Sequence, residues 1–79
     1  MTMTVKTESG SIYVFTQKDG RTFFQRGLMT GEVVRINNGP ITIGKNIIMD
    51  FRKDGLYGTP DKDTMFANTT PVTEISVIL

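Results

Sequence analysis

Side chains branched at the Cβ atom dominate this chain. Valine, isoleucine and threonine make up roughly a third of its 79 residues, whereas alanine occurs once, at Ala67, and leucine three times. Branched side chains lose rotamer freedom against a helical turn but pack well on a pleated sheet. The residues that favour helix most are nearly absent. The composition therefore predicts an all-β protein.

The chain is short and lacks the groups that usually reinforce a small fold. A domain of 79 residues buries only about 60% of its unfolded surface, and small scaffolds commonly add a disulfide, a metal or a partner subunit. The sequence contains no cysteine and no histidine, which removes disulfides and the commonest metal ligands. We therefore expect one domain over residues 1–79 that forms a homo-oligomer.

The charge balance and hydropathy narrow the possible surroundings of the protein. Nine basic against eight acidic residues give a net charge of +1, far from the strongly basic character of a double-stranded DNA binder. No apolar run approaches the roughly 20 residues of a membrane helix, and residues 1–6 lack the pattern of a signal peptide. We expect a soluble, cytoplasmic protein that does not bind membranes.

Turn signals divide the chain into short β-rich runs without any linker between them. They include Ser9-Gly10, Asn37-Asn38-Gly39-Pro40 and Lys53-Asp54-Gly55. A polar stretch from Leu56 to Pro71 is expected to be a loop with one short strand near Thr64–Ala67. Such spacing predicts a small barrel or roll of five to seven mainly antiparallel strands. The expected strands lie near residues 2–7, 11–17, 21–26, 31–36, 40–43, 45–52 and 72–78.

The first hairpin poses a problem of register. A two-residue Asp19-Gly20 loop would place Lys18 opposite Arg21, and facing like charges are destabilising. A three-residue loop from Lys18 to Gly20 avoids that contact. We therefore expect Thr16 opposite Thr22, Phe15 opposite Phe23 and Val14 opposite Phe24. One face then carries Tyr13, Phe15, Phe23 and Gln25, and the other carries Ile12, Val14, Thr16, Thr22, Phe24 and Arg26.

Both faces of this hairpin are apolar, which is unusual for a half-buried antiparallel strand. One face is expected to meet a subunit, a partner or a ligand, or else to be covered by the polar loop. The uncharged C-terminal run from Ile75 to Leu79 would invite aggregation as an open edge, so we expect it to be paired in the sheet or between subunits. The predicted core comprises Val5, Val14, Phe24, Val34, Ile36, Ile43, Ile47, Met49, Phe51, Ile75 and Val77.

Catalytic equipment is scarce. Nucleophile–base pairs built on histidine or cysteine cannot form. Asp61 and Asp63 alternate like the start of a calcium loop, but its central glycine and final glutamate do not follow. Residues 39–45 match the glycine and lysine spacing of a phosphate-binding loop, but Asn46 stands where serine or threonine is required. We therefore expect no enzyme, no cofactor and no metal site.

Binding of a nucleotide or of RNA is harder to exclude, because aromatic side chains on a sheet flanked by cations hold bases in small barrels. The candidate stacking residues are Tyr13, Phe15, Phe23 and Tyr57. The candidate cations are Arg21, Arg26, Arg35, Lys45, Arg52 and Lys53. The alternative, which is favoured for any one residue, is that the phenylalanines belong to the core and the cations to the solvated surface.

The two ends of the chain carry a resemblance. Thr7-Glu8-Ser9-Gly10-Ser11-Ile12-Tyr13-Val14-Phe15 and Asn68-Thr69-Thr70-Pro71-Val72-Thr73-Glu74-Ile75 together resemble a group of small bacteriophage β-proteins, especially those of actinobacterial phages. The resemblance implies a phage or prophage origin and action in the cytoplasm of a bacterial host cell. It implies no activity and transfers no functional residue.

These observations lead to three hypotheses. The first is a phage-type interaction protein that inhibits a host or anti-phage defence component by binding it, with Tyr13, Phe15 and Phe23 as anchors. Its polar rim would be Arg21, Arg26 and Arg35. The second is an oligomer that sequesters a nucleotide or signal molecule at a subunit interface, with Tyr57 among the binding residues. The third is a small structural component of the virion.

Overall fold

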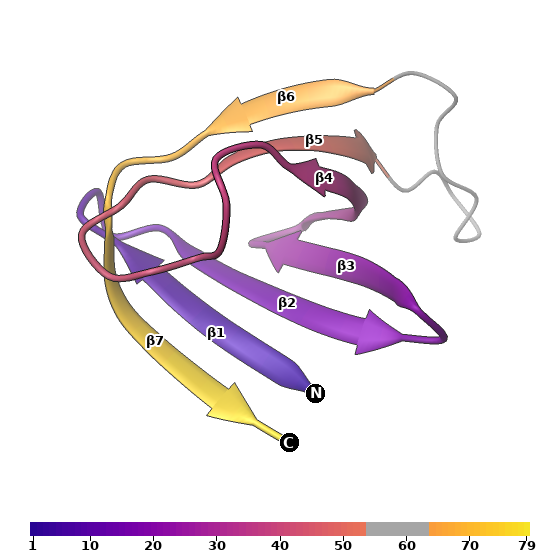
Figure 1. Cartoon of the computed structure of the whole chain (residues 1–79), viewed down its shortest axis with the longest axis horizontal. Helices are drawn as coiled ribbons and strands as arrows, with labels where there is room; N and C mark the ends of the chain where they lie inside the picture. The colour runs from indigo at the N-terminus through magenta and orange to yellow at the C-terminus, as the bar shows by residue number, and fades with distance from the viewer. Residues whose placement is uncertain (54–63) are drawn as a thin grey trace.

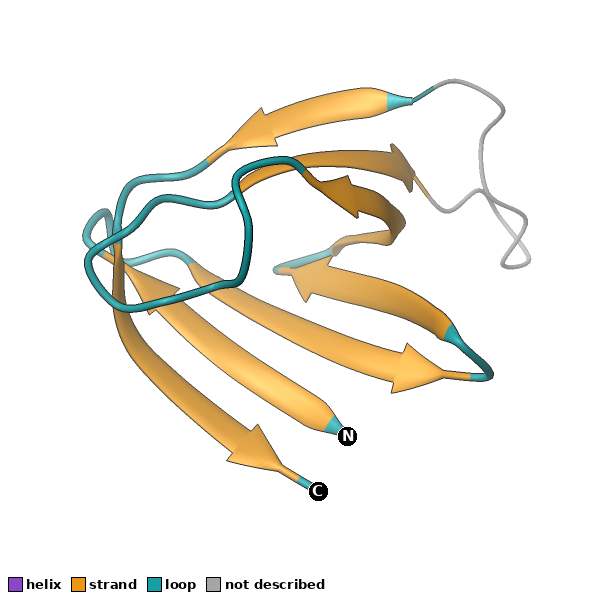
Figure 2. Ribbon diagram, viewed as in Figure 1, coloured by secondary structure: helices purple, strands orange, loops and turns teal. Residues whose placement is uncertain are grey.

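The computed structural model describes residues 1–53 and 64–79, and these residues form a single antiparallel sheet without helices. Figures 1 and 2 show the strands following one another around a curled sheet. The predicted all-β class is therefore confirmed. The strands are β1 (Thr2–Thr7), β2 (Ile12–Lys18), β3 (Arg21–Arg26), β4 (Met29–Ile36), β5 (Ile48–Lys53), β6 (Met65–Asn68) and β7 (Val72–Ile78).

The strand order makes the sheet an open half-barrel rather than a closed one. Its order is β6-β5-β4-β3-β2-β1-β7, and every pairing is antiparallel. The short link from β6 to β7 crosses from one edge of the sheet to the other, which draws the two edges together at one end (Figure 1). At the other end β6 and β7 diverge, so the concave interior opens there.

The strand predictions hold with one clear exception. The short strand expected near residues 64–67 is present as β6. The segment 40–43 is not a strand, and the whole of residues 37–47 forms a loop with no helix after it. Pro40 supplies no backbone N–H for a ladder. Asn38 instead ties the loop to the start of β5, because its side chain donates to the Asn46 carbonyl at 2.8 Å and accepts from the Ile48 N–H at 3.2 Å.

The expected register of the β2–β3 hairpin is wrong. Asp19 and Gly20 form a two-residue turn with positive φ angles of 53° and 75°, and Lys18 lies opposite Arg21. A two-residue turn with positive φ angles has a twist that matches the twist of the two strands. Asp-Gly favours such a turn because both residues tolerate positive φ. As a result, Phe15 lies opposite Phe24 and Thr16 lies opposite Phe23. The shift by one position exchanges Phe23 and Phe24 between the two faces.

The core lies on the concave face and is centred on aromatic rings. Phe24 packs edge-on against Phe51, with ring centroids 4.9 Å apart, and lies 6.5 Å from both Tyr13 and Phe15. Such pairs contribute about 0.5–1.5 kcal/mol each beyond the area they bury. The buried apolar residues are Val5, Tyr13, Phe15, Phe24, Ile47, Met49, Phe51 and Val72.

The predicted core list is correct at five positions and wrong at others. Val5, Phe24, Ile47, Met49 and Phe51 are buried, and Ile36 and Ile75 pack partly against them. Val14 lies half-buried on the opposite face, and the positions that are exposed instead are Val34, Ile43 and Val77. Ile43 is exposed because its segment is a loop. Val34 sits at an irregularity in the β4–β5 register, where strict alternation breaks down.

Gly31 of β4 is required by close packing at the centre of the sheet. A Cβ atom at this position would lie 2.8 Å from the Arg52 carbonyl oxygen and 2.8 Å from a ring carbon of Phe24. Real Cβ atoms do not approach backbone and ring atoms so closely, so any larger residue would displace β5 or the Phe24 ring. The glycine therefore allows the aromatic core to sit directly against the sheet.

The two segments that carry the resemblance lie side by side at the closed end of the sheet. The Glu8 N–H donates to the Pro71 carbonyl at 2.9 Å, and the Ser9 N–H donates to the Thr70 hydroxyl at 3.1 Å. Nearby, the Gly44 N–H donates to the Val72 carbonyl, and the Val72 N–H donates to the Lys45 carbonyl. These contacts join the end of β1 to the link before β7, and the start of β7 to the long loop. Both segments therefore have a structural part in the fold.

Candidate binding surface

Two of the predicted anchor residues lie in the core rather than on a surface. Tyr13 and Phe15 project from β2 to the concave face and are only 7% and 4% exposed. Their rings are held by each other and by Phe24. The expectation that they form part of a docking surface is therefore corrected. The one-residue shift in register brings Phe24 onto the face of Tyr13 and Phe15, and this concave face holds the core. Tyr57 lies outside the described residues.

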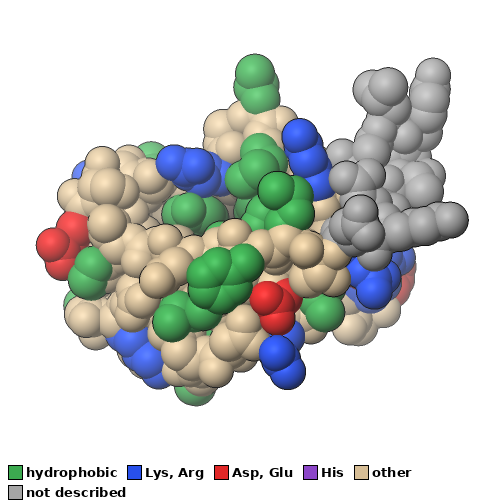
Figure 3. Space-filling model, turned by 90° about the horizontal axis from the view of Figure 1, so that it is seen from above, with side chains coloured by type: hydrophobic (Ala, Val, Ile, Leu, Met, Phe, Trp, Pro, Cys, Tyr) green, Lys and Arg blue, Asp and Glu red, His purple; other side chains and the backbone are tan. Residues whose placement is uncertain are grey.

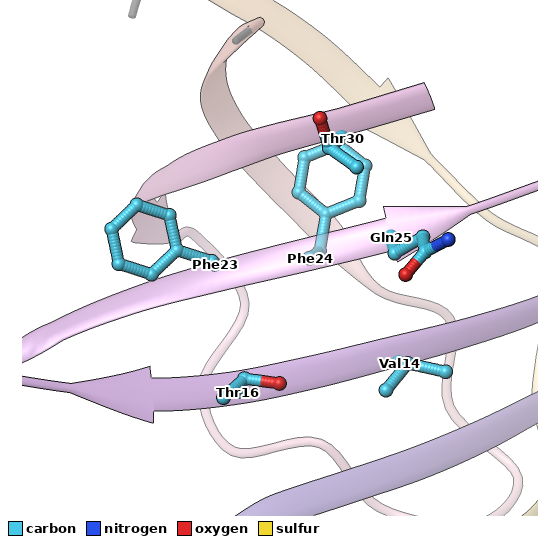
Figure 4. A pocket seen from close by; sticks show the side chains of 6 residues that line it. All are labelled: Val14, Thr16, Phe23, Phe24, Gln25 and Thr30. Carbon is cyan, nitrogen blue, oxygen red and sulfur yellow. The ribbon is translucent and has the colours of Figure 1, made fainter. Parts of the chain in front are cut away.

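Phe23 points the other way, onto the convex face of the sheet. It is half-buried there and lies directly between Thr16 of β2 and Glu32 of β4. A second row of neighbours on the same face runs from Val14 through Gln25 to Thr30. Together these rows form a hollow of about 230 Å³, which Figure 4 shows from close by. Its lining residues are Val14, Thr16, Phe23, Phe24, Gln25 and Thr30.

Arg21 and Glu32 flank the hollow on the side of the β2–β3 turn. The guanidinium carbon of Arg21 lies 5.1 Å from the centroid of the Phe23 ring, within the range of a cation–π contact. The same guanidinium donates a hydrogen bond to the Glu32 carboxylate. This bond, together with the charges of Arg21 and Arg52, lowers the pKa of Glu32 below its ordinary value. The Phe23 ring is thus bordered by paired charges.

The other two arginines of the predicted rim lie elsewhere. Arg26 shares the concave face with Tyr13, lies 5.7 Å from the centroid of that ring, and donates to the Ser11 hydroxyl at 3.3 Å. Arg35 donates to the Asp50 carboxylate at 3.4 Å and to the Asn37 side chain at 2.5 Å. The described site residues are therefore divided between two faces of the sheet. Arg21 and Phe23 meet on the convex face, whereas Arg26 lies against Tyr13 on the concave face, where Tyr13 also packs with Phe15.

The open mouth of the half-barrel forms a second, more apolar hollow of about 250 Å³ on the concave side. No motif in the sequence predicts it, because its lining residues come from separate strands and the long loop. It is lined by Met3, Phe15 and Ile36, which come from three different strands, and by Ile41 of the long loop. No charged side chain lines this hollow from the described part of the chain. The described lining residues are Met1, Met3, Phe15, Gln17, Thr22, Ile36 and Ile41.

Several large hydrophobic side chains are exposed outside these hollows. Hydrophobic atoms gather in patches on the face seen from above the sheet (Figure 3). Met65 and Phe66 are exposed on β6, and Val77 and Ile78 are exposed on β7, so both edge strands carry them. Among residues 1–53 and 64–79, no group of histidine, cysteine or carboxylate side chains is arranged to hold a metal ion. The same residues include no helix long and apolar enough to cross a membrane.

The convex hollow could have been found from the sequence with one different choice. The expected three-residue loop gives Phe23 the wrong neighbours on β2. It therefore does not predict the lining residues Val14, Thr16, Gln25 and Thr30. An Asp-Gly pair between two β-rich runs is the strongest local signal for a two-residue turn. Giving that signal more weight than the repulsion between Lys18 and Arg21 yields the observed register.

Comparisons with known proteins add no relative: no family model, no curated protein and no solved structure matches this chain.

Proposed function

We propose that this chain is a non-enzymatic, phage-type interaction protein that binds and inhibits a host or anti-phage defence component in the bacterial cytoplasm. Its contact region would be the Phe23 surface, which we define as Arg21, Phe23 and the hollow-lining residues Val14, Thr16, Gln25 and Thr30. One observation carries the proposal. An aromatic ring with an arginine beside it borders a hollow on the convex face, while the core of the sheet occupies the other face.

The chemistry of this surface suits a protein partner. Aromatic and arginine side chains near the centre of a contact carry most of the binding energy of many protein interfaces. The Phe23 ring is large enough to anchor a contact, and Thr16, Gln25 and Thr30 offer hydrogen-bonding groups around it. Arg21 and Glu32 already form an ion pair, so a partner would not have to bury an uncompensated charge at this edge.

A nucleotide-binding function has less support. A phosphate ligand requires free cations that converge on one point, yet Arg26 contacts Tyr13 and Ser11 whereas Arg35 contacts Asp50 and Asn37. Arg21 and Arg52 do line one hollow, but they share it with the Glu32 carboxylate, which pairs with Arg21. The apolar mouth of the half-barrel has the volume for a small molecule, but its lining residues within 1–53 and 64–79 include no charged side chain. This second hollow would therefore favour an apolar ligand over a nucleotide.

Affinity capture from bacterial lysate with a matched pair of variants tests the proposal. The wild-type chain is expected to retain one protein in stoichiometric amount, and addition of the chain to that purified protein is expected to reduce its activity. Phe23→Ala removes a hot-spot ring and should weaken binding by about 30-fold or more.

Phe66→Ala is the control, because it makes the same substitution at an exposed phenylalanine on β6, with β4 and β5 between it and β3. It should retain the partner at wild-type affinity. Full binding by Phe23→Ala, or loss of binding by Phe66→Ala, would place the contact elsewhere and contradict the proposal. A captured protein whose activity does not change would contradict the inhibitory function.

A further inference from the structure

Strand β7 ends the sheet with one side of its backbone outside the ladder. Among residues 1–53 and 64–79 its only strand partner is β1, in a register that pairs Thr4 with Ser76 and Val5 with Ile75. On the other side, the long loop occupies the backbone of Val72 alone, through Gly44 and Lys45. From Thr73 onward, the described residues supply no second ladder for β7. This side of the strand can therefore accept another strand.

The hydrogen-bond pattern identifies which backbone groups point outward. The Met1 carbonyl, just before β1, accepts from the Gln17 N–H, and the Thr7 N–H at the end of β1 donates to the Ser11 carbonyl. The odd-numbered residues along β1 therefore direct their backbone N–H and C=O groups toward β2. Backbone groups alternate along an antiparallel strand, so Thr4 faces β7 and its partner Ser76 faces β1. The N–H and C=O groups of Ile75 and Val77 therefore point away from the sheet.

The side chains along this edge carry no protection against pairing. Natural edge strands are usually blocked by lysine, proline, an inward-pointing charge or a bulge. Between Ile75 and Ile78 there is no charge and no proline, and the irregularity in the β1–β7 register lies before Glu74. Val77 is 50% exposed and Ile78 is 68% exposed. By contrast, the other edge strand, β6, has only four residues.

We propose that β7 pairs with β7 of a second copy of this chain, antiparallel and around a two-fold axis at Ser76. Ile75 of each copy then lies opposite Val77 of the other copy. Each of these two equivalent Ile75–Val77 pairs exchanges two backbone hydrogen bonds. Ser76 lies opposite the partner's Ser76, and Glu74 lies opposite the partner's Ile78. Centring the axis on Ile75 would instead bring the partner's Ile78 against Val72, whose backbone is already occupied.

In this register the charges of the two copies do not repel each other, and their apolar side chains lie on the same face of the joined sheet. Glu74 is the only charged residue of β7, and the pairing keeps the two Glu74 carboxylates away from each other. Ile75 pairs with buried Val5, and Val77 pairs with Met3, so both side chains lie on the concave side. Pairing Ile75 with the partner's Val77 therefore continues the concave apolar surface from one copy into the next and covers the exposed Val77.

Charge variants at the axis test this dimer directly. Ser76 is exposed, so Ser76→Lys should leave the chain folded while placing two lysines opposite each other. We expect wild type to be a dimer in analytical ultracentrifugation, and Ser76→Lys and Ser76→Glu each to dimerise about tenfold or more weakly. An equimolar mixture of the two variants should form a heterodimer, which native mass spectrometry resolves by mass.

Val77→Pro gives an independent test, because it removes an outward N–H without removing a bond to β1. It should be monomeric, and its Ile75 amide should exchange with solvent fast, whereas the same amide in the wild-type dimer should exchange slowly. A wild-type chain that stays monomeric at about millimolar concentration would overturn the proposal. Unchanged dimerisation of Ser76→Lys, or no preference for the mixed pair, would overturn it as well.

The dimer and the Phe23 surface can fail separately. Strands β2 and β1 lie between β3 and β7 in the sheet, so the pairing leaves the convex hollow open. Phe23→Ala should therefore remain a dimer. Ser76→Lys should bind the captured partner with the wild-type affinity per chain.

Discussion

At the scale of single residues, Arg21 shows how repulsion across a hairpin is compensated by neighbouring side chains on the same face of the sheet. Its position opposite Lys18 is unfavourable within the hairpin alone. In the folded chain its guanidinium binds the Glu32 carboxylate and lies against the Phe23 ring. Both contacts come from side chains on the convex face, so the same surface that compensates the repulsion also forms the proposed binding site.

Glu32→Gln should lower stability slightly and make it less dependent on pH. The pKa of Glu32 is lowered in the folded state, chiefly by its hydrogen bond with Arg21. A lowered pKa stabilises the fold above the ordinary pKa of about 4.3, and this contribution is lost as pH falls through the lowered value. Because Arg21 is 52% exposed, we expect a loss of only about 0.5 kcal/mol or less at pH 7. Urea unfolding at pH values from 7 to 2.5 measures the effect.

The difference between wild type and Glu32→Gln should shrink as pH falls through that range, because the Glu32 carboxylate becomes protonated and loses its charge. It should also shrink at about 1 M NaCl, because salt screens an exposed ion pair. A difference that grew as pH fell would mean that the charged carboxylate does not stabilise the fold.

At the scale of elements, the β2–β3 turn decides which phenylalanine is core and which is surface. Asp19 has a φ of 53°, which the two-residue turn requires and which a three-residue loop built on an ordinary turn would not. Aspartate tolerates this conformation better than most residues other than glycine. The short turn therefore fixes the register that buries Phe24 and leaves Phe23 on the convex face.

Asp19→Val should destabilise the chain by about 1–2 kcal/mol, because a β-branched residue is strained at positive φ. Urea unfolding monitored by circular dichroism gives the value. Asp19→Asn is the matched control, since asparagine accepts the same conformation, and it should stay within about 0.5 kcal/mol of wild type. Equal stability of the valine variant would point to the three-residue loop instead.

At the scale of the whole molecule, the loop over residues 37–47 compensates for the missing closure of the barrel. It joins the two edges of the sheet, because the Thr69 N–H donates to the Ile47 carbonyl while Gly44 and Lys45 bind Val72 at the start of β7. Ile47 from this loop is 1% exposed and belongs to the core. The loop therefore holds the closed end of the half-barrel and leaves the other end, with the apolar mouth, open.

Asn38→Ala should weaken the attachment of this loop to β5 and lower the free energy of unfolding by about 1–2 kcal/mol. The reason is that it leaves the Ile48 N–H and the Asn46 carbonyl without their side-chain partner. Hydrogen exchange should speed up at the Gly44 and Val72 amides before it does in β2 and β3. Asn37→Ala is the control. Its side chain is exposed and, among the residues that the structure describes, accepts a hydrogen bond from Arg35 alone, so stability should change by less than about 0.5 kcal/mol. Equal losses of stability in the two variants would mean that the Asn38 side chain does not hold the loop in place.

The sequence by itself determined the all-β class, the approximate position of most strands and part of the core, including Val5, Met49 and Phe51. These properties follow from local chemistry, since β-branched side chains favour extended backbone and alternation marks a buried face. The tertiary structure decided whether Phe23 or Phe24 faces outward, and it separated Arg26 and Arg35 from Arg21. A register depends on contacts between strands, and each one-residue step reverses the faces, so patterns along a single strand cannot fix it. For the same reason the outward-pointing backbone of Ile75 and Val77 emerged only when β7 was placed at the edge of the sheet.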